Sequence, residues 1–187
     1  MYYHASPAAG ITVLEPRISN HGVPLIYFST KRENTLVYLS NSIEKYCRDT
    51  GFTHSGPWTK WGPYGFRGEV QQLEEYYPNA LRETYQGVSG YIYCASSIPE
   101  SEQSIAIPYA AASSVPVPVS GVEFVPDAYE AILEAEQAGL LLVTRYEALT
   151  PSTLEWIQKT MQEQYNNAGN QPEYRYFLRS KFAFIQA

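Results

Sequence analysis

The sequence has few of the features that mark common functional classes. Only two of its 187 residues are cysteines, Cys47 and Cys94. Their spacing fits neither a disulfide framework nor a metal-binding pair. Each lies in an apolar segment, which favours a buried thiol over a reactive one. A chain without a disulfide framework is typical of a reducing compartment, so we expect a cytoplasmic protein.

Basic residues and long apolar runs are also scarce. The chain has 13 Lys and Arg against 19 Asp and Glu, a formal net charge of −6. Because contacts to nucleic-acid phosphates need clustered basic side chains, this balance argues against a broad nucleic-acid surface. A small anionic ligand held by one arginine or by backbone N–H groups stays possible. No apolar run reaches membrane-spanning length and the N-terminus has no signal-peptide pattern, so we expect no membrane partner.

Several catalytic motifs are absent from the sequence. It contains no Walker-type phosphate loop, no Cys-x-x-Cys pair and no His-Glu-x-x-His motif. It also lacks the Gly-x-Ser-x-Gly motif of nucleophile-elbow hydrolases. The three histidines, His4, His21 and His54, are scattered and have no partners at metal-ligand spacing. We therefore expect no metal site.

Tyrosine is the abundant residue, with 17 positions. Its apolar ring and polar tip suit half-buried strands and ligand-facing clefts, although packing alone is the simpler explanation of the excess. The apolar fraction of 44% and charged fraction of 17% are typical of a globular protein. The length suits one domain. We expect a single domain over residues 1–187, with a helical or irregular C-terminal extension from about residue 127.

The segment 24–40 has the pattern of a buried strand that turns directly into a helix. Residues 25–28 form a short apolar and aromatic run, which favours a strand. Thr30 and Glu33 have the spacing of a capping box, which predicts a helix that begins there. Apolar residues then recur at helical spacing through residue 47. Such a strand-to-helix junction is a common place for a ligand site.

The rest of the chain gives several further predictions. Asp127 and Thr150 are expected to cap helices. The loop at 50–68 carries many large aromatic residues and predicts either a packed flap or a binding surface. The segment 174–185 fits a strand or a helix. Further strands are predicted at residues 1–5, 91–95, 122–125 and 140–144. Short strands and helices without regular alternation predict an α+β protein.

Three of the predicted strands carry short motifs in a fixed order. They are His4-Ala-Ser6, then Ile26-Tyr-Phe-Ser-Thr30, then Gly90-Tyr-Ile-Tyr93 with an acidic loop, Pro99-Glu-Ser-Glu102, after it. With these motifs the chain resembles the ADP-ribosyltransferase-like superfamily, in particular small bacterial members such as the rifampin ADP-ribosyltransferases. The resemblance covers about the first two-thirds of the chain. Ala5 stands where the family usually has glycine.

The resemblance implies an α+β fold of two small, mostly antiparallel sheets that form an NAD-binding cleft, with peripheral helices. In that cleft His4 would hydrogen-bond a ribose hydroxyl of NAD, and Ser6 would also contact NAD. Tyr27 would stack on the nicotinamide ring, which an aromatic face does well.

The resemblance also implies a catalytic acidic residue. It would stabilise the oxocarbenium-like charge that develops as nicotinamide leaves. Glu102 is the best match by position, and Glu100 and Glu123 are the alternatives. The expected function is transfer of ADP-ribose from NAD, as substrate and without a metal, to an acceptor that the sequence does not identify. The alternatives are a non-catalytic nucleotide- or protein-binding module on the same fold, and an assembly protein that uses its aromatic surface.

Overall fold

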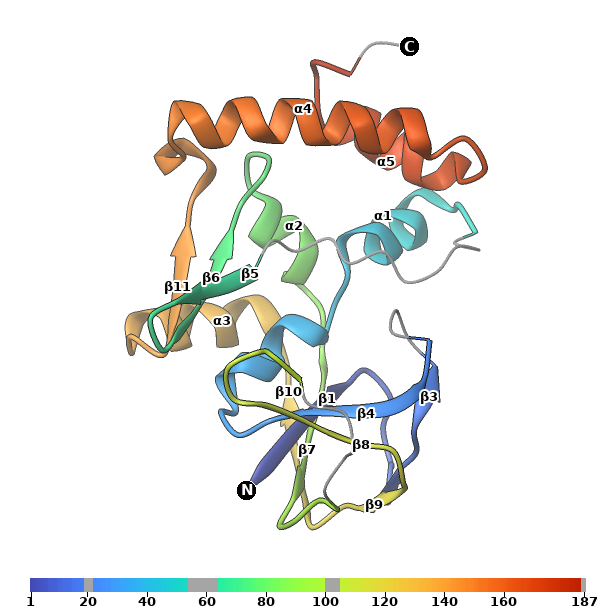
Figure 1. Ribbon diagram of the computed structural model, residues 1–187, viewed down its shortest axis with the longest axis vertical. Coiled ribbons are helices and arrows are strands. Elements are labelled where there is room, and N and C mark those ends of the chain that lie inside the picture. Colours follow the sequence, from blue (N-terminus) through green and yellow to red (C-terminus); the bar gives the residue numbers. More distant parts are fainter. Residues whose placement is uncertain (19–21, 54–63, 100–104, 186–187) are drawn as a thin grey trace.

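The computed structural model describes residues 1–18, 22–53, 64–99 and 105–185. Over these ranges the protein has a six-stranded, a three-stranded and a two-stranded sheet together with helices (Figure 1). This confirms the α+β class with small, mostly antiparallel sheets. The two-stranded sheet is additional to the two sheets that the sequence predicts. Within the same ranges no helix combines the length and apolar character needed to cross a bilayer.

The larger sheet has the strand order β10-β7-β1-β4-β3, and β8 also pairs with β4. All its pairings are antiparallel. Its strands are β1 (Tyr2–Ser6), β3 (Arg17–Ile18), β4 (Pro24–Ser29), β7 (Gly90–Ala95), β8 (Ala110–Ser113) and β10 (Gly121–Val125). β1 lies inside the sheet, as a strand so close to the chain start must if it is to be ordered.

The chain after β4 forms two helices, not the single capped helix that the sequence predicts. A 3₁₀ helix, η1 (Glu33–Tyr38), has no side-chain cap and is followed by α1 (Ser42–Thr50). The capping box is therefore wrong. The N–H of Thr30 donates instead to the carbonyl of Tyr109 at 2.9 Å, because β8 continues to pair alongside β4 up to this point. α1 is capped instead by Asn41, whose side chain accepts two backbone N–H groups.

The smaller sheets and the second half of the chain complete the fold. β5 (Tyr64–Arg67) and β6 (Val70–Glu74) are antiparallel, and β11 (Leu141–Thr144) is parallel to β6. β2 (Val13–Leu14) pairs with β9 (Val117–Pro118). Among the helices, α2 covers Ala80–Tyr85, and α3 (Ala128–Gln137) is capped by Asp127 as predicted. The short 3₁₀ helix η2 is Tyr146–Ala148.

Two C-terminal helices lie together at the top of Figure 1. The longer one, α4 (Pro151–Asn167), begins at the predicted Thr150 cap. Its buried side is Ile157, Met161 and Tyr165, while Leu154 is half-buried. The segment that the sequence left open is mostly helix, α5 (Pro172–Lys181).

Buried side chains form three clusters. The central cluster lies between one face of the six-stranded sheet and η1, α3 and β11, and contains Leu36, Ile92, Val125, Ile132 and Leu141 among others. The outer cluster covers the opposite face of that sheet and contains Leu14, Ile26, Phe28, Tyr93, Ala95 and Val117. The helical cluster joins α1, α4 and α5. These clusters decide which face of each strand is available to a ligand.

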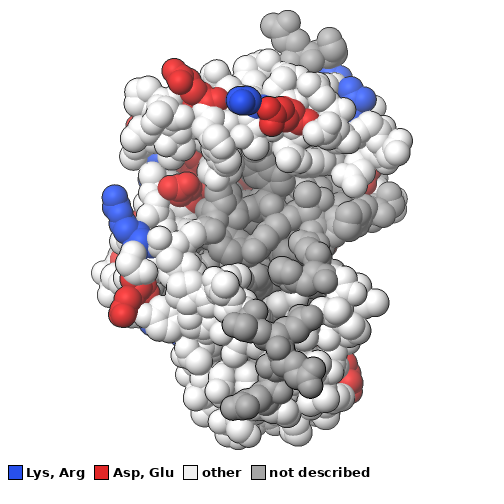
Figure 2. Space-filling view, viewed as in Figure 1, with Lys and Arg blue, Asp and Glu red and all other residues white. Residues whose placement is uncertain are grey.

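The two thiols and the surface charge agree only in part with the sequence predictions. Cys47 is buried in the helical cluster as expected, but Cys94 is only half-buried. Burial raises the pKa of both thiols, which keeps them protonated at neutral pH. Charged side chains are sparse on the face in Figure 2, where they lie mainly along the upper and left margins.

Candidate functional site

The candidate site lies where β1 and β4 separate. β1 pairs with β7 along its whole length, from Tyr2↔Ala95 to Ser6↔Tyr91. Its register with β4 is confined to a single pair, Tyr3↔Ser29. The first residues of β4 pair with β3 instead, through Arg17↔Leu25 and Ile18↔Pro24. The sheet therefore opens next to His4, within the described part of the chain.

His4 bridges this opening through its side chain. Its Nδ1 lies 2.8 Å from the carbonyl oxygen of Tyr27. Because a carbonyl can only accept, Nδ1 carries the hydrogen and Nε2 carries the lone pair of a neutral imidazole. Nε2 has no hydrogen-bond partner within the described residues. The ring also contacts Phe28, with a centroid distance of 5.9 Å, which fixes its orientation.

The protonation state of His4 follows from its surroundings. Burial lowers its pKa, the hydrogen bond to Tyr27 acts in the opposite direction, and the positive charge of Arg17 lowers the pKa further. The net effect is a pKa below the ordinary value, so the imidazole is neutral at neutral pH. Arg17 is exposed on β3 and forms no ion pair within the part of the chain that the structure describes.

Tyr27 meets His4 through its backbone and not through its ring. Ile26 and Phe28, its neighbours on β4, both belong to the outer cluster. Since side chains alternate along a strand, the ring of Tyr27 lies on the other face. His4 contacts Phe28 and therefore lies on the outer-cluster face. A ligand would have to enter the opening between the strands to reach both rings.

Ser6 and Ala5 occupy the end of β1. The Oγ of Ser6 accepts the N–H of Ala8 at 3.2 Å, and alternation puts its side chain on the face of His4. Ala5 packs against the central cluster. Its methyl group therefore points away from His4, and alanine at this position leaves the His4 face open.

Within the described residues, no acidic candidate from the sequence lies beside His4. Glu102 and Glu100 lie outside those residues. Glu123, on β10, is paired with Ile92, which in turn is paired with Ala5. Cross-strand partners share a face, so Glu123 lies on the face opposite His4.

The carboxylate of Glu123 is held by Arg32. The Nε of Arg32 donates to one oxygen at 3.0 Å, and a terminal nitrogen of the guanidinium donates to the other. This bidentate hydrogen bonding lowers the pKa of Glu123, with burial acting against it. Glu123 is thus ionised and engaged in a surface ion pair.

The other candidate features from the sequence either lie outside the described residues or form no metal site within them. His21, His54 and most of the aromatic loop at 50–68 lie outside the described residues. Within those residues there is no group of three or more His, Cys, Asp or Glu side chains arranged to hold a metal.

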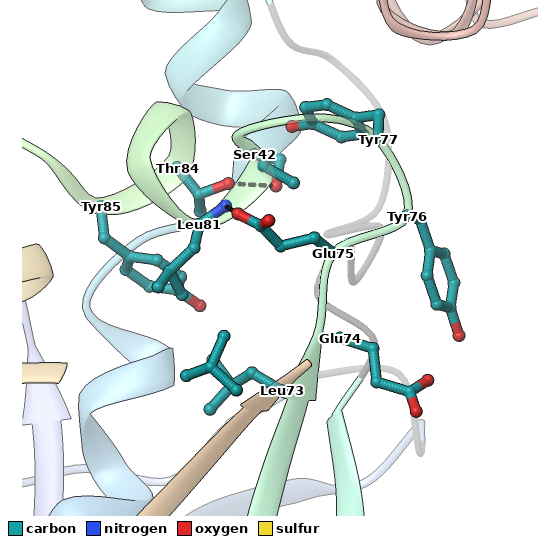
Figure 3. Close-up of a pocket in the computed structure, with 11 residues that line it drawn as sticks. Ser42, Leu73, Glu74, Glu75, Tyr76, Tyr77, Leu81, Thr84 and Tyr85 are labelled. Atoms are coloured by element: carbon teal, nitrogen blue, oxygen red, sulfur yellow. Dashed lines mark hydrogen bonds between the residues drawn. The ribbon is translucent and has the colours of Figure 1, made fainter. Parts of the chain in front are cut away.

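A pocket that sequence reasoning missed lies between α1, α2 and β6 (Figure 3). Its cavity volume is only about 30 Å³. Glu75 is buried there, and its carboxylate accepts the N–H groups of Leu81 at 2.9 Å and Tyr146 at 3.3 Å. The hydroxyls of Ser42 and Thr84 are 2.8 Å apart. Nothing in the local pattern around residue 75 distinguishes this carboxylate from an exposed one.

The pocket and the opening at His4 are separate features. None of the candidate residues from the sequence lines the pocket. The polar side chains in the pocket bond to the protein itself, which is typical of a structural role.

We compared the chain with protein-family models, with curated proteins and with solved structures, and none of the three comparisons gives a match.

Proposed function

We propose that the protein is an NAD-dependent ADP-ribosyltransferase-like protein that binds NAD at the opening between β1 and β4. The observation that carries the proposal is the state of His4. Its Nδ1 is held by the carbonyl of Tyr27, its imidazole is neutral, and its Nε2 is left as an acceptor at a break in the sheet. The resemblance of the three strand motifs points to the same residue.

A neutral imidazole held in this way suits a sugar hydroxyl. The hydroxyl donates to Nε2 while Nδ1 stays bonded to Tyr27, so the ring needs no rearrangement when the ligand binds. Preorganised donors and acceptors of this kind lower the cost of ordering a bound ligand. The ribose next to nicotinamide is the sugar that the resemblance implies.

Arg17 supports a ligand with a negative charge. Its positive charge reaches His4. Its cross-strand partner Leu25 lies on the Tyr27 face of the sheet, so one ligand contacts both Arg17 and His4 only by entering the opening between the strands. A guanidinium binds phosphate oxygens in a bidentate manner. The diphosphate of NAD supplies this charge a short distance from the ribose.

In the proposed reaction the bond between ribose C1′ and the nicotinamide nitrogen breaks. Nicotinamide leaves with the bonding electrons, and a nucleophile of the acceptor forms the new bond to C1′ and loses its proton. The positive charge that develops on the ribose needs a carboxylate nearby. Glu102, with Glu100 beside it in sequence, is the proposed source.

The second candidate is a non-catalytic nucleotide- or protein-binding module on the same fold. The observation that favours it is the position of Glu123, which is bonded to Arg32 on the sheet face opposite His4. Without an acid from the loop after β7, the site would bind NAD and leave its glycosidic bond intact.

The test combines binding and turnover. We expect NAD at millimolar concentration to raise the melting temperature, and we expect His4→Ala and Arg17→Gln to reduce that shift. Arg67→Gln, at another exposed arginine, is the matched control and keeps the full shift. Free nicotinamide in the sample distinguishes the transferase from the binding module, and the transferase loses this release in Glu102→Gln. No shift in the wild-type protein would exclude both.

A further inference from the structure

Lys31, just after β4, joins three segments of the chain. Its Nζ donates to the carbonyl of Glu69 at 2.9 Å, in the turn between β5 and β6. The same ammonium lies 3.8 Å from the centre of the ring of Tyr109, the residue before β8. Phe66 of β5 also contacts that ring, with centroids 6.3 Å apart. We call Lys31, Phe66, Glu69 and Tyr109 the lysine clasp.

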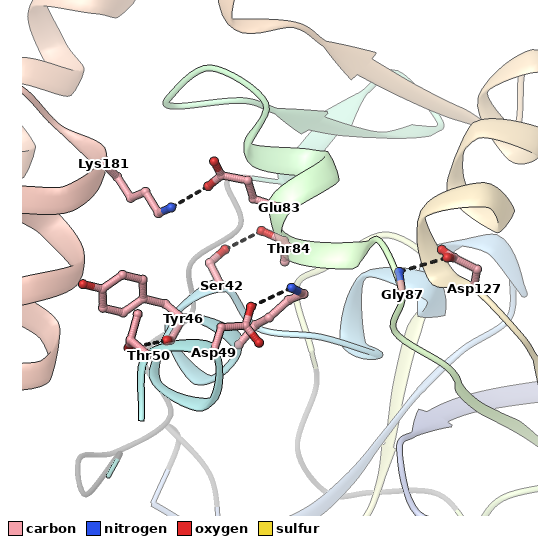
Figure 4. A network of polar contacts seen from close by, with 10 residues as sticks. Ser42, Tyr46, Asp49, Thr50, Glu83, Thr84, Gly87, Asp127 and Lys181 are labelled. Atoms are coloured by element: carbon pink, nitrogen blue, oxygen red, sulfur yellow. Dashed lines mark hydrogen bonds and ion pairs between the residues drawn. The ribbon is translucent and has the colours of Figure 1, made fainter. Parts of the chain in front are cut away.

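The contacts of Lys31 differ from those of two other lysines. Lys45 pairs with Asp49 and Lys181 pairs with Glu83 (Figure 4). Within the described residues no carboxylate pairs with Lys31, whose ammonium contacts a neutral carbonyl and an aromatic ring. The negative face of a ring attracts a cation, and the attraction grows as water is excluded. Since Lys31 is half-buried, its charge favours this position of the ring.

Tyr109 is the third residue of a tight turn that covers residues 107–110. The N–H of Ala110 donates to the carbonyl of Ile107 at 3.1 Å, which closes the turn. The ring of Pro108, at the second position, fixes its φ at about −65°. Tyr109 has a positive φ of 63°. A negative φ followed by a positive φ defines a type II turn, whose third residue is normally glycine.

The backbone of this turn is strained at Tyr109. A positive φ costs free energy in a residue with a bulky side chain, and it persists only where the surroundings hold it. A type I turn is the alternative without this strain. Its third residue has a negative φ, and Pro108 fits its second position equally well. Since tyrosine alone favours type I, the contacts of its ring with Lys31 and Phe66 are what favour type II.

The turn leads directly into the six-stranded sheet. β8 begins at Ala110, which is paired with Ser29 of β4 (Figure 1). The carbonyl of Tyr109 extends this pairing, because it accepts the N–H of Thr30 at 2.9 Å. On the other side of the clasp, the turn of the β5–β6 hairpin at residues 67–69 is exposed. The clasp therefore connects an exposed hairpin turn to the place where β8 enters the sheet.

We propose that the turn at residues 107–110 is a two-state switch, which the ammonium of Lys31 holds in its type II form. In the closed state Lys31 contacts both the ring of Tyr109 and the carbonyl of Glu69. In the open state the ammonium leaves both groups, the peptide between Pro108 and Tyr109 turns over, and the turn becomes type I. Opening also releases the hairpin turn. The inference goes beyond the proposed function, because it does not require NAD.

The test is NMR spectroscopy of the protein without NAD. A type II turn brings the Hα of Pro108 close to the amide proton of Tyr109, so a strong nuclear Overhauser effect between them reports the closed state. We expect Lys31→Met, which keeps the apolar stem, to lower the ratio of closed to open by about fivefold. Lys31→Arg keeps a cation over the ring and stays within about twofold of the wild type. Lys159→Met, at an exposed lysine on α4, is the matched control and keeps the wild-type ratio.

Two substitutions of Tyr109 separate the strain from the ring contact. Tyr109→Ala keeps the strain and loses the ring, so it opens the turn and decides alone if Lys31→Met fails to fold. Tyr109→Gly removes the strain, so the turn stays type II and Lys31→Met has no further effect in that background. A weak effect in the wild-type protein, an unchanged effect in Lys31→Met or Tyr109→Ala, or an equal loss in Lys159→Met would overturn the inference. So would a loss that Lys31→Met causes equally in the Tyr109→Gly background.

Discussion

At the scale of single residues, His4 shows how much of the candidate site the sequence predicts. The strand motif identifies the residue, but its chemical state depends on contacts that no local pattern encodes. The carbonyl of Tyr27, 23 positions away, decides which nitrogen carries the hydrogen. Arg17 reaches the ring only because β3 pairs with β4. The sequence gives the identity of the residue, and the tertiary fold decides its tautomer and charge.

The lowered pKa of His4 predicts a pH dependence of stability. The unfolded chain binds the proton more tightly than the folded protein does, so the free energy of unfolding falls as the pH drops below about 6.5 and levels off below the folded pKa. His4→Asn keeps a donor near the Nδ1 position and removes the titration. We expect urea unfolding at about pH 7.5 and about pH 5.5 to show a smaller difference for this variant. Equal differences in the two proteins would contradict the neutral state of His4.

Gly90, the first residue of β7, is predicted to be intolerant of a side chain. A Cβ there would lie 2.6 Å from the Cδ2 of Leu39 and 3.2 Å from the carbonyl oxygen of Ser6. Leu39 is buried and can shift only in part, so we expect Gly90→Ala to lower the free energy of unfolding by about 1–3 kcal/mol. The control is Gly121→Ala, whose Cβ meets Cys94 at an ordinary 3.8 Å. Equal stability of the two variants in chemical denaturation would contradict the packing.

At the scale of elements, the sequence predicts strands and isolated helices better than junctions. β1, β7, β10, β11 and the caps at Asp127 and Thr150 follow from local pattern. The junction after β4 does not, because Thr30 is held by Tyr109, a residue 79 positions away. A capping box and tertiary hydrogen bonds compete for the same backbone groups, and here the N–H of Thr30 is bonded to the sheet.

The junction after β4 predicts different effects for substitutions at Asn41 and at Thr30. The side chain of Asn41 accepts the N–H groups of Ile43 at 2.9 Å and Glu44 at 3.2 Å. We expect Asn41→Ala to cost about 1 kcal/mol of stability, as the loss of an N-cap does. Thr30→Ala removes no helix cap and should cost less. Thermal unfolding of both variants measures the difference. A larger loss of stability in Thr30→Ala would show that Thr30 does cap the helix.

At the scale of the whole molecule, the two C-terminal helices are attached mainly by packing. Phe177 is fully buried and contacts Tyr46, Tyr77 and Tyr174. The ion pair between Lys181 and Glu83 is partly exposed, so it contributes about 0–1 kcal/mol. The sequence predicts the apolar stripe of α4 but leaves the segment of α5 open between strand and helix. It does not identify α1 as their partner, since helical periodicity does not show which surface covers a stripe.

This difference predicts how the helices respond to mutation. We expect Phe177→Ala to lower the free energy of unfolding by about 3–5 kcal/mol, as the removal of a fully buried aromatic ring does. Lys181→Met keeps the apolar part of the side chain and should stay within about 1 kcal/mol of the wild-type protein. Urea unfolding monitored by circular dichroism checks both. Similar losses in the two variants would mean that the ion pair, and not the packing, holds α5.

A crystal structure of the protein with NAD shows directly whether the dinucleotide binds next to His4. We expect density for the dinucleotide at the opening between β1 and β4, with a ribose hydroxyl within hydrogen-bond distance of Nε2 of His4 and the diphosphate near Arg17. NAD bound in the pocket beside Glu75, or crystals grown at saturating NAD without density next to His4, would contradict it.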